Sequence, residues 1–412
     1  MIDLKAVKRN IQEIDSLSLV RSLIVLEVAV MLFSTAATVV VEALVFLCFI
    51  SSGKLRKRVF SELKQPMVIM ALVLSVMVTL GVFYSAAPFS ESMDMLKSWR
   101  KLLLVPLVAS VYADTLWKNR LVYYFTGLIV FSALVSFAGY LFDFSIYNRP
   151  LGIVVANHAT QGMLFSVAMF ACLVLSRFPL SSDFFPGWLL KCSAGLLALN
   201  ILFVTPGRSG YLASIVLVMA FSFWGIKKKT RIVFMLLAPV VILSLLLVSP
   251  VAQDRIRIGL DEIENYKQSP ELTAMGVRIV MWKNTVEILK KFEHPVLGYG
   301  TNGFETAYRE QVVNEKGWQG EPVGDPHNQY LRILVEYGVV GLMLFLLFIS
   351  SFFRQRIRGR SYILGIGVLL AWCATSMFNP HFTTFVEGRF LMIWCSTLLS
   401  VNISQTTESL DL

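Results

Sequence analysis

The sequence is poor in charged residues, cysteine and histidine, and these shortages narrow the classes of protein that fit. Only 16% of its 412 residues are charged, whereas roughly a quarter is usual in soluble domains, so neither a soluble globular enzyme nor a disordered chain fits. The five cysteines form no Cys-x-x-Cys pair, and a zinc site or a disulfide framework is therefore not expected. With four histidines in the chain, each can be weighed individually as an acid–base group.

Several common catalytic motifs are also missing or lack their structural context. There is no Gly-x-Ser-x-Gly for an α/β-hydrolase triad and no Asp-x-Asp, and Glu91 and Asp94 fit an ordinary solvated loop. The segment Gly298-Tyr-Gly300-Thr-Asn-Gly303 matches the letters of a dinucleotide-binding motif, but it follows a predicted helix and a proline instead of a strand. We interpret its glycines as a tight chain reversal or a close backbone approach to substrate. We expect no bound cofactor and no metal site.

What the chain has in abundance is apolar sequence. Hydrophobic residues make up 56% of it. They come in blocks of about 15–22 residues, long enough to cross a hydrocarbon core of about 30 Å as a helix. We predict an all-α polytopic membrane protein surrounded by a phospholipid bilayer. Twelve spans are predicted, at residues 17–34, 36–52, 66–84, 101–113, 121–141, 161–177, 188–205, 210–226, 232–250, 328–353, 361–378 and 389–404.

Lysine and arginine are distributed unevenly between the connecting segments. With the N-terminus inside, the cytoplasmic segments hold 21 of the 37 basic residues, including the clusters at 54–58, 227–231 and 354–360. Because short cytoplasmic loops are enriched in these residues, we predict that both termini are cytoplasmic. The N-terminal segment is expected to be a cytoplasmic tail, not a cleaved signal peptide. Basic clusters beside membrane spans anchor topology next to anionic lipid, so the net charge of +10 does not predict nucleic-acid binding.

Residues 251–327 are the one long polar stretch, and we place them outside, on the side of the membrane opposite the termini. They divide the chain into helices 1–9 (residues 1–250), this loop, and helices 10–12 (residues 328–412). Loops of this length are usually functional or disordered, and the aromatic residues here argue against disorder. Apolar residues recur at helical spacing over residues 276–292. This spacing predicts an amphipathic helix on the membrane surface or across the mouth of the bundle.

Four arginines stand where a charge is unexpected. Arg208 lies in a tight Thr-Pro-Gly-Arg-Ser-Gly break between two predicted spans. A guanidinium that keeps its proton suits an anion such as phosphate at that point. Arg278 lies on the amphipathic helix, Arg149 in an outer loop, and Arg389 beside Glu387 at the outer start of the last span. For each, the alternative is structural: a snorkelling side chain, a solvated helix face or an ion pair.

His327 is the strongest histidine candidate. It lies in the sequence Asp-Pro-His-Asn at the outer entry to the tenth predicted span. A neutral imidazole there could take a proton from a hydroxyl, and Asp325 could orient the ring. His294 fits a turn, whereas His158 and His381 lie near outer span ends and fit core or interfacial positions.

The sequence around His327 resembles the signature of bacterial O-antigen ligases. His327 and the asparagine after it, nine further residues, Gly338, two residues and Gly341 are similar to the pattern of that family. Arg278 and Arg208 match further family positions, and the twelve-span layout with one large loop agrees, so the resemblance covers essentially the whole chain. We expect the two glycines to permit close helix approach.

The resemblance implies a C-type glycosyltransferase-like helical bundle and a specific reaction. O-antigen glycan would move from undecaprenyl pyrophosphate to a sugar hydroxyl of lipid A–core, at the periplasmic face of the bacterial inner membrane, with neither ATP nor metal. His327 would be the general base, contributing about 10²–10⁴-fold, and Arg208 and Arg278 would hold the pyrophosphate. The remaining predicted substrate-binding residues are Arg149, Arg389 and Asn328.

Three other functions stay open. O-antigen polymerases usually carry paired Arg-x10-Gly motifs, and here the long loop has one, at Arg309 and Gly320. Protein O-oligosaccharyltransferases share parts of the signature and tend to be longer at the C-terminus. A transporter of lipid-linked glycan would need ionisable residues in mid-membrane and repeated halves. The early spans contain only Glu27 and Glu42, and no internal repeat is visible.

Overall fold

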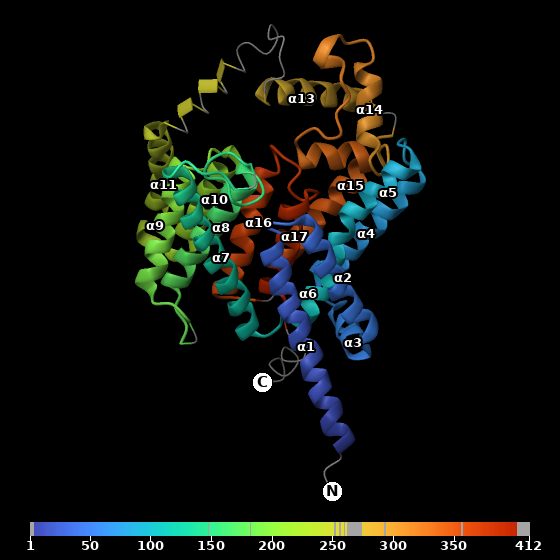
Figure 1. Ribbon diagram of the computed structural model, residues 1–412. Helices are drawn as coiled ribbons and strands as arrows, with labels where there is room; N and C mark the ends of the chain where they lie inside the picture. The colour runs from blue at the N-terminus through green and yellow to red at the C-terminus, as the bar shows by residue number, and fades with distance from the viewer. Residues whose placement is uncertain are drawn as a thin grey trace.

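The computed structural model describes residues 4–401 apart from 147, 182, 251–252, 255–256, 259, 262–273, 292–293 and 356. All regular secondary structure in this part of the chain is helical, and most of the helices form one bundle (Figure 1). The bundle helices are α1 (Leu4–Val30), α2 (Thr35–Ser51), α3 (Gly53–Glu62), α4 (Pro66–Phe83), α5 (Phe89–Trp99), η1 (Arg100–Leu103), α6 (Leu104–Val111), α7 (Thr115–Leu141), α8 (His158–Arg177), α9 (Gly187–Phe203), α10 (Arg208–Gly225), α11 (Lys228–Val248), α15 (Gln329–Phe353), α16 (Arg360–Thr375) and α17 (Phe385–Leu399).

Every one of the twelve predicted spans overlaps a helix, but the helices differ in their capacity to cross a membrane. Within the described residues, six are long and apolar enough by themselves, and a seventh results if α2 and α3 count as one span bent by 97°. The short fourth predicted span is the η1–α6 pair, and α5, which precedes it, is a helix where we expected a solvated loop. A multi-pass membrane protein is therefore supported, and the count of twelve stays a prediction.

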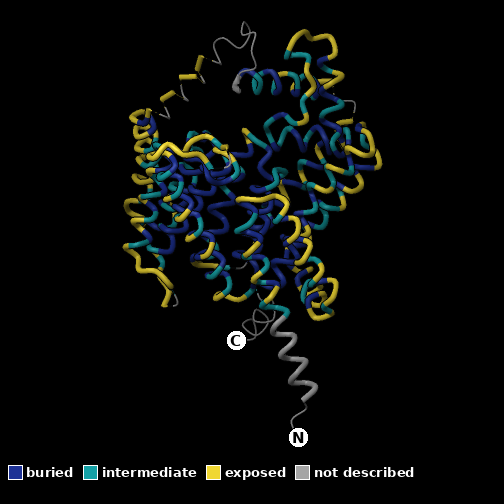
Figure 2. Tube along the Cα trace, in the orientation of Figure 1, coloured by how far each residue is buried: buried dark blue, intermediate teal, exposed yellow. Residues whose placement is uncertain are grey.

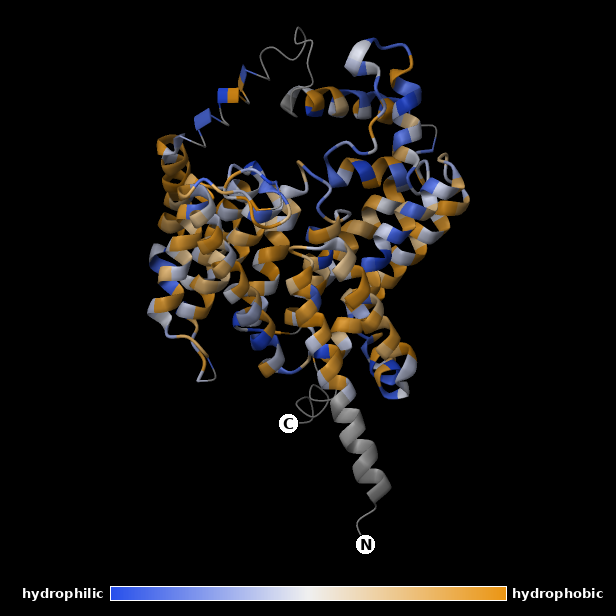
Figure 3. Ribbon diagram, in the orientation of Figure 1, coloured by the Kyte–Doolittle hydropathy of each residue, from blue (hydrophilic) through white to orange (hydrophobic). Residues whose placement is uncertain are grey.

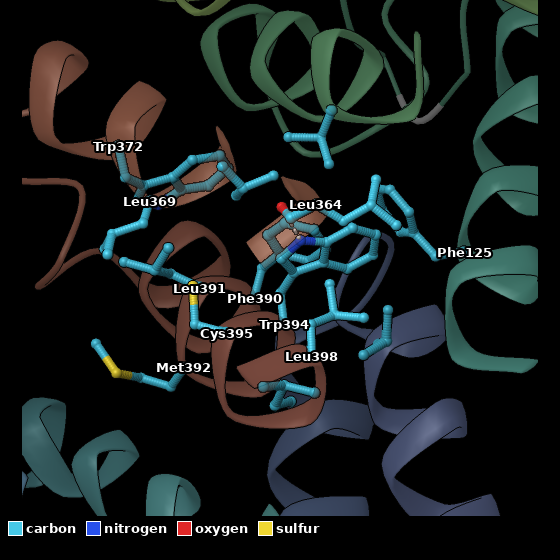
Figure 4. Packing of buried hydrophobic residues seen from close by; sticks show 14 of the residues in the cluster. Phe125, Leu364, Leu369, Trp372, Phe390, Leu391, Met392, Trp394, Cys395 and Leu398 are labelled. Carbon is cyan, nitrogen blue, oxygen red and sulfur yellow. Dashed lines mark hydrogen bonds between the residues drawn. The ribbon is translucent and has the colours of Figure 1, made fainter. Parts of the chain in front are cut away.

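The core and the surface of the bundle are both apolar, as a lipid environment requires. Phe125, Trp372, Phe390 and Trp394 pack against one another in the core, where the Trp394 indole donates to the carbonyl of Leu364 at 3.1 Å (Figure 4). Helix α8 is buried along nearly its whole length, whereas α11 exposes most of its apolar side chains. The exposed parts in Figure 2 include long stretches that are hydrophobic in Figure 3. Apolar patches of this extent mark a surface covered by lipid or a partner.

Segments that the sequence assigns to the cytoplasm meet one another. Arg360, at the start of α16, pairs with Asp183 of the α8–α9 loop at 2.7 Å. The ammonium of Lys118, in the first turn of α7, donates to the carbonyl of Ser400 after α17 at 2.6 Å. The relative placement of these loops is as predicted. The absolute orientation, with both termini cytoplasmic, stays a prediction.

Two helices of the long loop lie across the opposite end of the bundle: α13 (Ala274–Lys290) and α14 (Gly303–Val312) (Figure 1). The predicted amphipathic helix is α13, and Phe292, the last residue of that prediction, lies outside the described residues. Met281 and Ile288 of α13 pack with Phe304 and Tyr308 of α14 and with Val335 of α15. The apolar face of α13 is thus covered by protein, which favours a position across the bundle mouth. The short helix η2 (Gly317–Gly320) follows α14.

Helix α15 is broken at Gly338, where φ is +63° and ψ is −164°. A Cβ atom on Gly338 would lie 2.3 Å from the carbonyl oxygen of Val296. The close neighbour there is a loop backbone, so our expectation of close helix approach was wrong at this glycine. The amides of Tyr299 and Gly300 donate to the carbonyls of the α15 residues 335 and 336 at 3.0 and 2.7 Å. The amide of residue 339 donates to the carbonyl of residue 295 at 2.9 Å, so loop and broken helix satisfy each other.

Candidate active site

The backbone at His327 is held in an uncommon conformation by its neighbours. Its φ is +48°, which is rare for a residue other than glycine and is concentrated at functional sites. The backbone N–H of His327 donates to Oδ1 of Asp325 at 2.7 Å. Asn328 then caps α15, because its Oδ1 accepts from the amides of Tyr330 and Leu331 at 3.0 and 3.1 Å. These contacts fix the direction in which the imidazole projects. Its side chain is 38% exposed.

Asn379, in the loop between α16 and α17, joins three of the segments that the sequence singled out. Its Oδ1 lies 3.3 Å from Nδ1 of His327 and 3.4 Å from Nη2 of Arg278. Its Nδ2 donates to Oγ of Ser209, the residue after Arg208, at 3.1 Å. The structure therefore brings His327, Arg278 and the start of α10 together around one amide. Sequence reasoning missed Asn379, although an Asn-Pro-His triplet between two apolar spans is a detectable polar signal.

The contacts of Asn379 also determine the proton position on His327. A guanidinium is only a donor, so the Asn379 atom that faces Arg278 must be the oxygen. The same oxygen faces Nδ1 of His327, which must then carry the hydrogen in the neutral ring. The lone pair is left on Nε2. An imidazole with its lone pair on Nε2 and Nδ1–H held by an acceptor is arranged as a general base.

Arg278 is placed by the docking of α13. The indole of Trp282, one turn further along, donates to the carbonyl of Pro326 at 2.9 Å, and its ring lies 5.9 Å from that of Phe378. Trp282 thus ties α13 both to the residue before His327 and to the loop that carries Asn379. Because Arg278 and Trp282 are separated by one helical turn, they lie on the same face of α13. The partly exposed guanidinium is held at the site by this anchor.

Arg208 is the first residue of α10, and its surroundings explain the glycines beside it. A Cβ on Gly207 would lie 2.7 Å from the carbonyl oxygen of His158, and one on Gly210 would lie 2.7 Å from Cα of Gly162. The glycines therefore let α10 start directly against α8; φ of Gly207 is an ordinary −111°. No side chain among the described residues caps α10. The N-terminus of a helix, with its unpaired amides and positive dipole end, favours anions.

His381 is a buried neighbour of the site. Its side chain is almost fully buried, and within the described part of the chain neither ring nitrogen has a hydrogen-bond partner. Burial lowers the pKa of His381; Glu387 opposes this effect, and Arg278 adds to it. The buried Lys101 holds the loop that contains Asn379 and His381. Its ammonium group donates to the carbonyls of residues 383 and 384, both at 2.6 Å.

Arg149 and Arg389 have other surroundings. A guanidinium nitrogen of Arg149 donates to the carbonyl of Val154 in its own loop at 2.6 Å. Nε of Arg389 lies 2.7 Å from Oε2 of Glu42, and Arg100 approaches the other oxygen of the same carboxylate at 2.7 Å. The contacts of Arg389 thus correspond to the structural ion pair that we considered as the alternative, although with Glu42 and not with the neighbouring Glu387. Substrate-binding roles for Arg149, Arg389 and Asn328 stay predictions.

The remaining sequence expectations concern metals and glycines. Among the described residues, no three His, Cys, Asp or Glu side chains gather in a way that would hold a metal ion. Asp94 pairs with Lys97 at 2.8 Å on the exposed side of α5. Gly298 and Gly300 have φ of +71° and +80°, and they form the turn that enters the break in α15. That turn is the chain reversal we expected.

Comparisons with known proteins show which part of the chain is similar to a described family. Residues 193–346 match the family model described as O-antigen ligase. The match includes Arg208, Arg278 and His327, whereas Asn379 lies beyond it. An uncharacterised protein of Haemophilus influenzae is 26% identical over 262 residues, which cover 61% of this chain and 63% of that relative, less than two thirds of its length. The part of the chain that carries Arg208, Arg278 and His327 is therefore the part that is similar to the O-antigen ligase family model.

Proposed function

We propose that the protein is an O-antigen ligase. It transfers a glycan from undecaprenyl pyrophosphate to a sugar hydroxyl of lipid A–core at the periplasmic face of the inner membrane. The observation that carries the proposal is the convergence on Asn379 of His327, Arg278 and the α10 start at Ser209. A base and two guanidinium-bearing segments meet at one end of an apolar bundle. A lipid-linked diphosphate donor needs this combination.

The reaction divides into a proton transfer and a displacement. Nε2 of His327 takes the proton of the acceptor hydroxyl, and the resulting oxygen bonds to the anomeric carbon of the donor sugar. The bond between that carbon and the diphosphate oxygen breaks, and the diphosphate leaves with the electron pair. Arg278 and Arg208 stabilise the charge that develops on the leaving group. Diphosphate is a good leaving group, so the mechanism includes no nucleotide.

The polymerase alternative receives no support from its one sequence match. Arg309 lies on α14 and pairs with Glu305 at 3.1 Å, and its side chain is 63% exposed. Gly320 is placed against the backbone of Glu315. Arg309 thus forms a surface ion pair within α14, and Gly320 permits a close approach to the backbone of Glu315. The ligase is therefore the function we propose.

Reconstitution tests the proposal directly. Purified protein in liposomes would receive undecaprenyl-pyrophosphate-linked glycan and lipid A–core, with EDTA and without nucleotide. Glycan on lipid A–core is the expected result. Glycan that lengthens on the undecaprenyl carrier would identify a polymerase instead. Loss of transfer in EDTA that Mg²⁺ restores would refute metal independence and direct attention to Glu91 and Asp94.

A further inference from the structure

A cavity with a mixed polar and aromatic lining lies at the far end of α13 from Arg278. It has a volume of about 500 Å³ and lies between the end of α4, the turn after α13, and α14. This volume is within the range of small-ligand sites, about 300–1,000 Å³. Neither the catalytic cluster nor the proposed reaction uses it. The side chains that matter here are Tyr84, His294, Tyr299, Thr306 and Glu310.

The walls of this cavity are held by contacts between distant parts of the chain. The hydroxyl of Tyr84 donates to the carbonyl of Leu297 at 3.0 Å, and the amide of Ala86 donates to the carbonyl of Tyr299 at 2.8 Å. The same turn is bonded to α15 at its break. The Tyr84 ring and the Tyr299 backbone are therefore fixed before any ligand arrives. A fixed wall lowers the entropy that binding would otherwise cost.

The lining combines flat aromatic faces with hydroxyl and carboxylate groups. The rings of His294 and Tyr299 lie 6.0 Å apart, nearly perpendicular to each other, and Tyr84 adds a third ring. Thr306 and Glu310 supply hydrogen-bonding oxygen atoms. A sugar offers an apolar C–H face to a ring and hydroxyl donors to a carboxylate. The described lining includes no lysine or arginine, so the Glu310 carboxylate disfavours a phosphate-bearing headgroup.

The cavity is also within reach of a chain that reacts at His327. Helix α13 carries Arg278 near its start and ends at Lys290, a distance of about 18 Å at 1.5 Å per residue. His294 comes four residues after the end of this helix. A linear glycan whose first sugar reacts beside Arg278 can thus place a later sugar in the cavity. The glycan of the donor is the polymer that the proposed reaction supplies.

We propose that this cavity is a binding subsite for an uncharged, hydroxyl-rich sugar of the donor glycan, several sugars away from the reacting end. The inference rests on the proposed function. It makes the enzyme sensitive to the length of its donor. A donor with a single sugar ends before the cavity, whereas a long donor reaches it.

The experiment compares Tyr84→Ala and Glu310→Gln with the wild type on two donors, one with a single sugar and one with a long glycan. For the long donor we expect KM to rise about two- to tenfold, the range of one aromatic contact, with kcat unchanged. For the short donor neither constant should change. Glu315→Gln, an exposed carboxylate outside the cavity, is the matched control. Equal effects on both donors, or none on either, would overturn the subsite.

A binding measurement keeps this inference separate from the proposed reaction. Long polysaccharide released from its lipid carrier is titrated into the purified full-length protein. Binding that weakens in Glu310→Gln and not in Glu315→Gln supports the subsite even if the chain transfers glycan to another acceptor. Equal binding by all three proteins, or no binding by the wild type, refutes it. Since Glu310 is exposed, Glu310→Gln tests the subsite even if Tyr84→Ala fails to fold.

Discussion

Two clusters in this protein contain arginines that look equivalent in the sequence, yet their surroundings differ. Around Glu42, Arg389 contributes to a closed ion pair in which the two side chains are 3% and 2% exposed. Around Asn379, Arg278 reaches a neutral amide next to an imidazole that is 38% exposed. The Arg389–Glu42 pair of the first cluster links two helices and is buried. In the second cluster the His327 side chain remains partly exposed.

The difference shows why the residue type alone does not identify a binding arginine. A buried guanidinium that faces a carboxylate is neutralised, and its removal leaves a charge behind. A partly exposed guanidinium beside a base can interact with an incoming anion. Accessibility and the nature of the partner separate the two cases.

Replacement of His327 should have the largest effect. His327→Ala removes the general base, and we expect transfer to fall by about 10²–10⁴-fold while binding of the lipid-linked donor is largely retained. Single-turnover transfer and donor binding, measured on the same preparation, would check this. Transfer at the normal rate would show that His327 is not the base.

Arg389→Met should reduce the stability of the protein more than it reduces the rate of transfer. It leaves Glu42 buried with Arg100 alone, and we expect a loss on the order of 3 kcal/mol in the free energy of unfolding. Unfolding in mixed detergent micelles would measure it. The double variant Arg389→Met/Glu42→Gln should regain part of the loss. Normal stability with reduced donor binding would instead place Arg389 at the substrate. The contrast between the cluster around Glu42 and the cluster around Asn379 would then be wrong.

Arg278→Ala and Arg208→Ala should show the opposite pattern. We expect kcat/KM for the donor to fall by about 10²-fold, with little change in stability, because both side chains are partly exposed. Arg309→Ala, which removes an exposed arginine paired with Glu305, is the control and should transfer normally. A defect in Arg309→Ala alone would favour a polymerase.

Variants of Asn379 test whether its contact with His327 contributes to kcat. Asn379→Ala removes the acceptor that holds Nδ1–H of His327, and we expect kcat to fall about tenfold, since one hydrogen bond to a charged or polarised group contributes 1.5 kcal/mol or more. Asn379→Asp keeps an acceptor at that place and should restore most of kcat. KM for the acceptor should change little in either variant. A rise in KM alone would give Asn379 a substrate-binding role.

The smallest effect concerns pH. The folded protein holds His381 with a lowered pKa, whereas the unfolded chain has an ordinary value of about 6.5. As the pH falls below that value, the unfolded state binds the proton first, so this histidine lowers stability in acid. His381→Leu should therefore reduce the loss of thermal stability between neutral and acidic pH. An unchanged slope in a thermal scan would show that His381 does not contribute.

The sequence predicted the helices better than it predicted the contacts between them. Apolar block length located a helix for each predicted span, and position together with the resemblance to O-antigen ligases singled out His327, Arg278 and Arg208 as candidates. Asn379 was missed because its importance depends on three segments, distant in sequence, that meet at its amide. Likewise, nothing in the sequence around Arg389 indicates that Glu42, from another helix, neutralises it.

The break in α15 bears on how this protein is assembled in the membrane. Residues 335, 336 and 339 hydrogen-bond to the 295–300 turn, and in lipid their backbone groups would otherwise have no partner. The turn precedes α15 in the chain and is synthesised first. Its hydrogen bonds to α15 can therefore form only after α15 has entered the membrane. A substitution such as Gly300→Ala, whose Cβ would lie 2.4 Å from Cα of Ser85, would hinder that meeting. Its consequence would be inefficient insertion and removal by cellular quality control, at a site with no part in the chemistry.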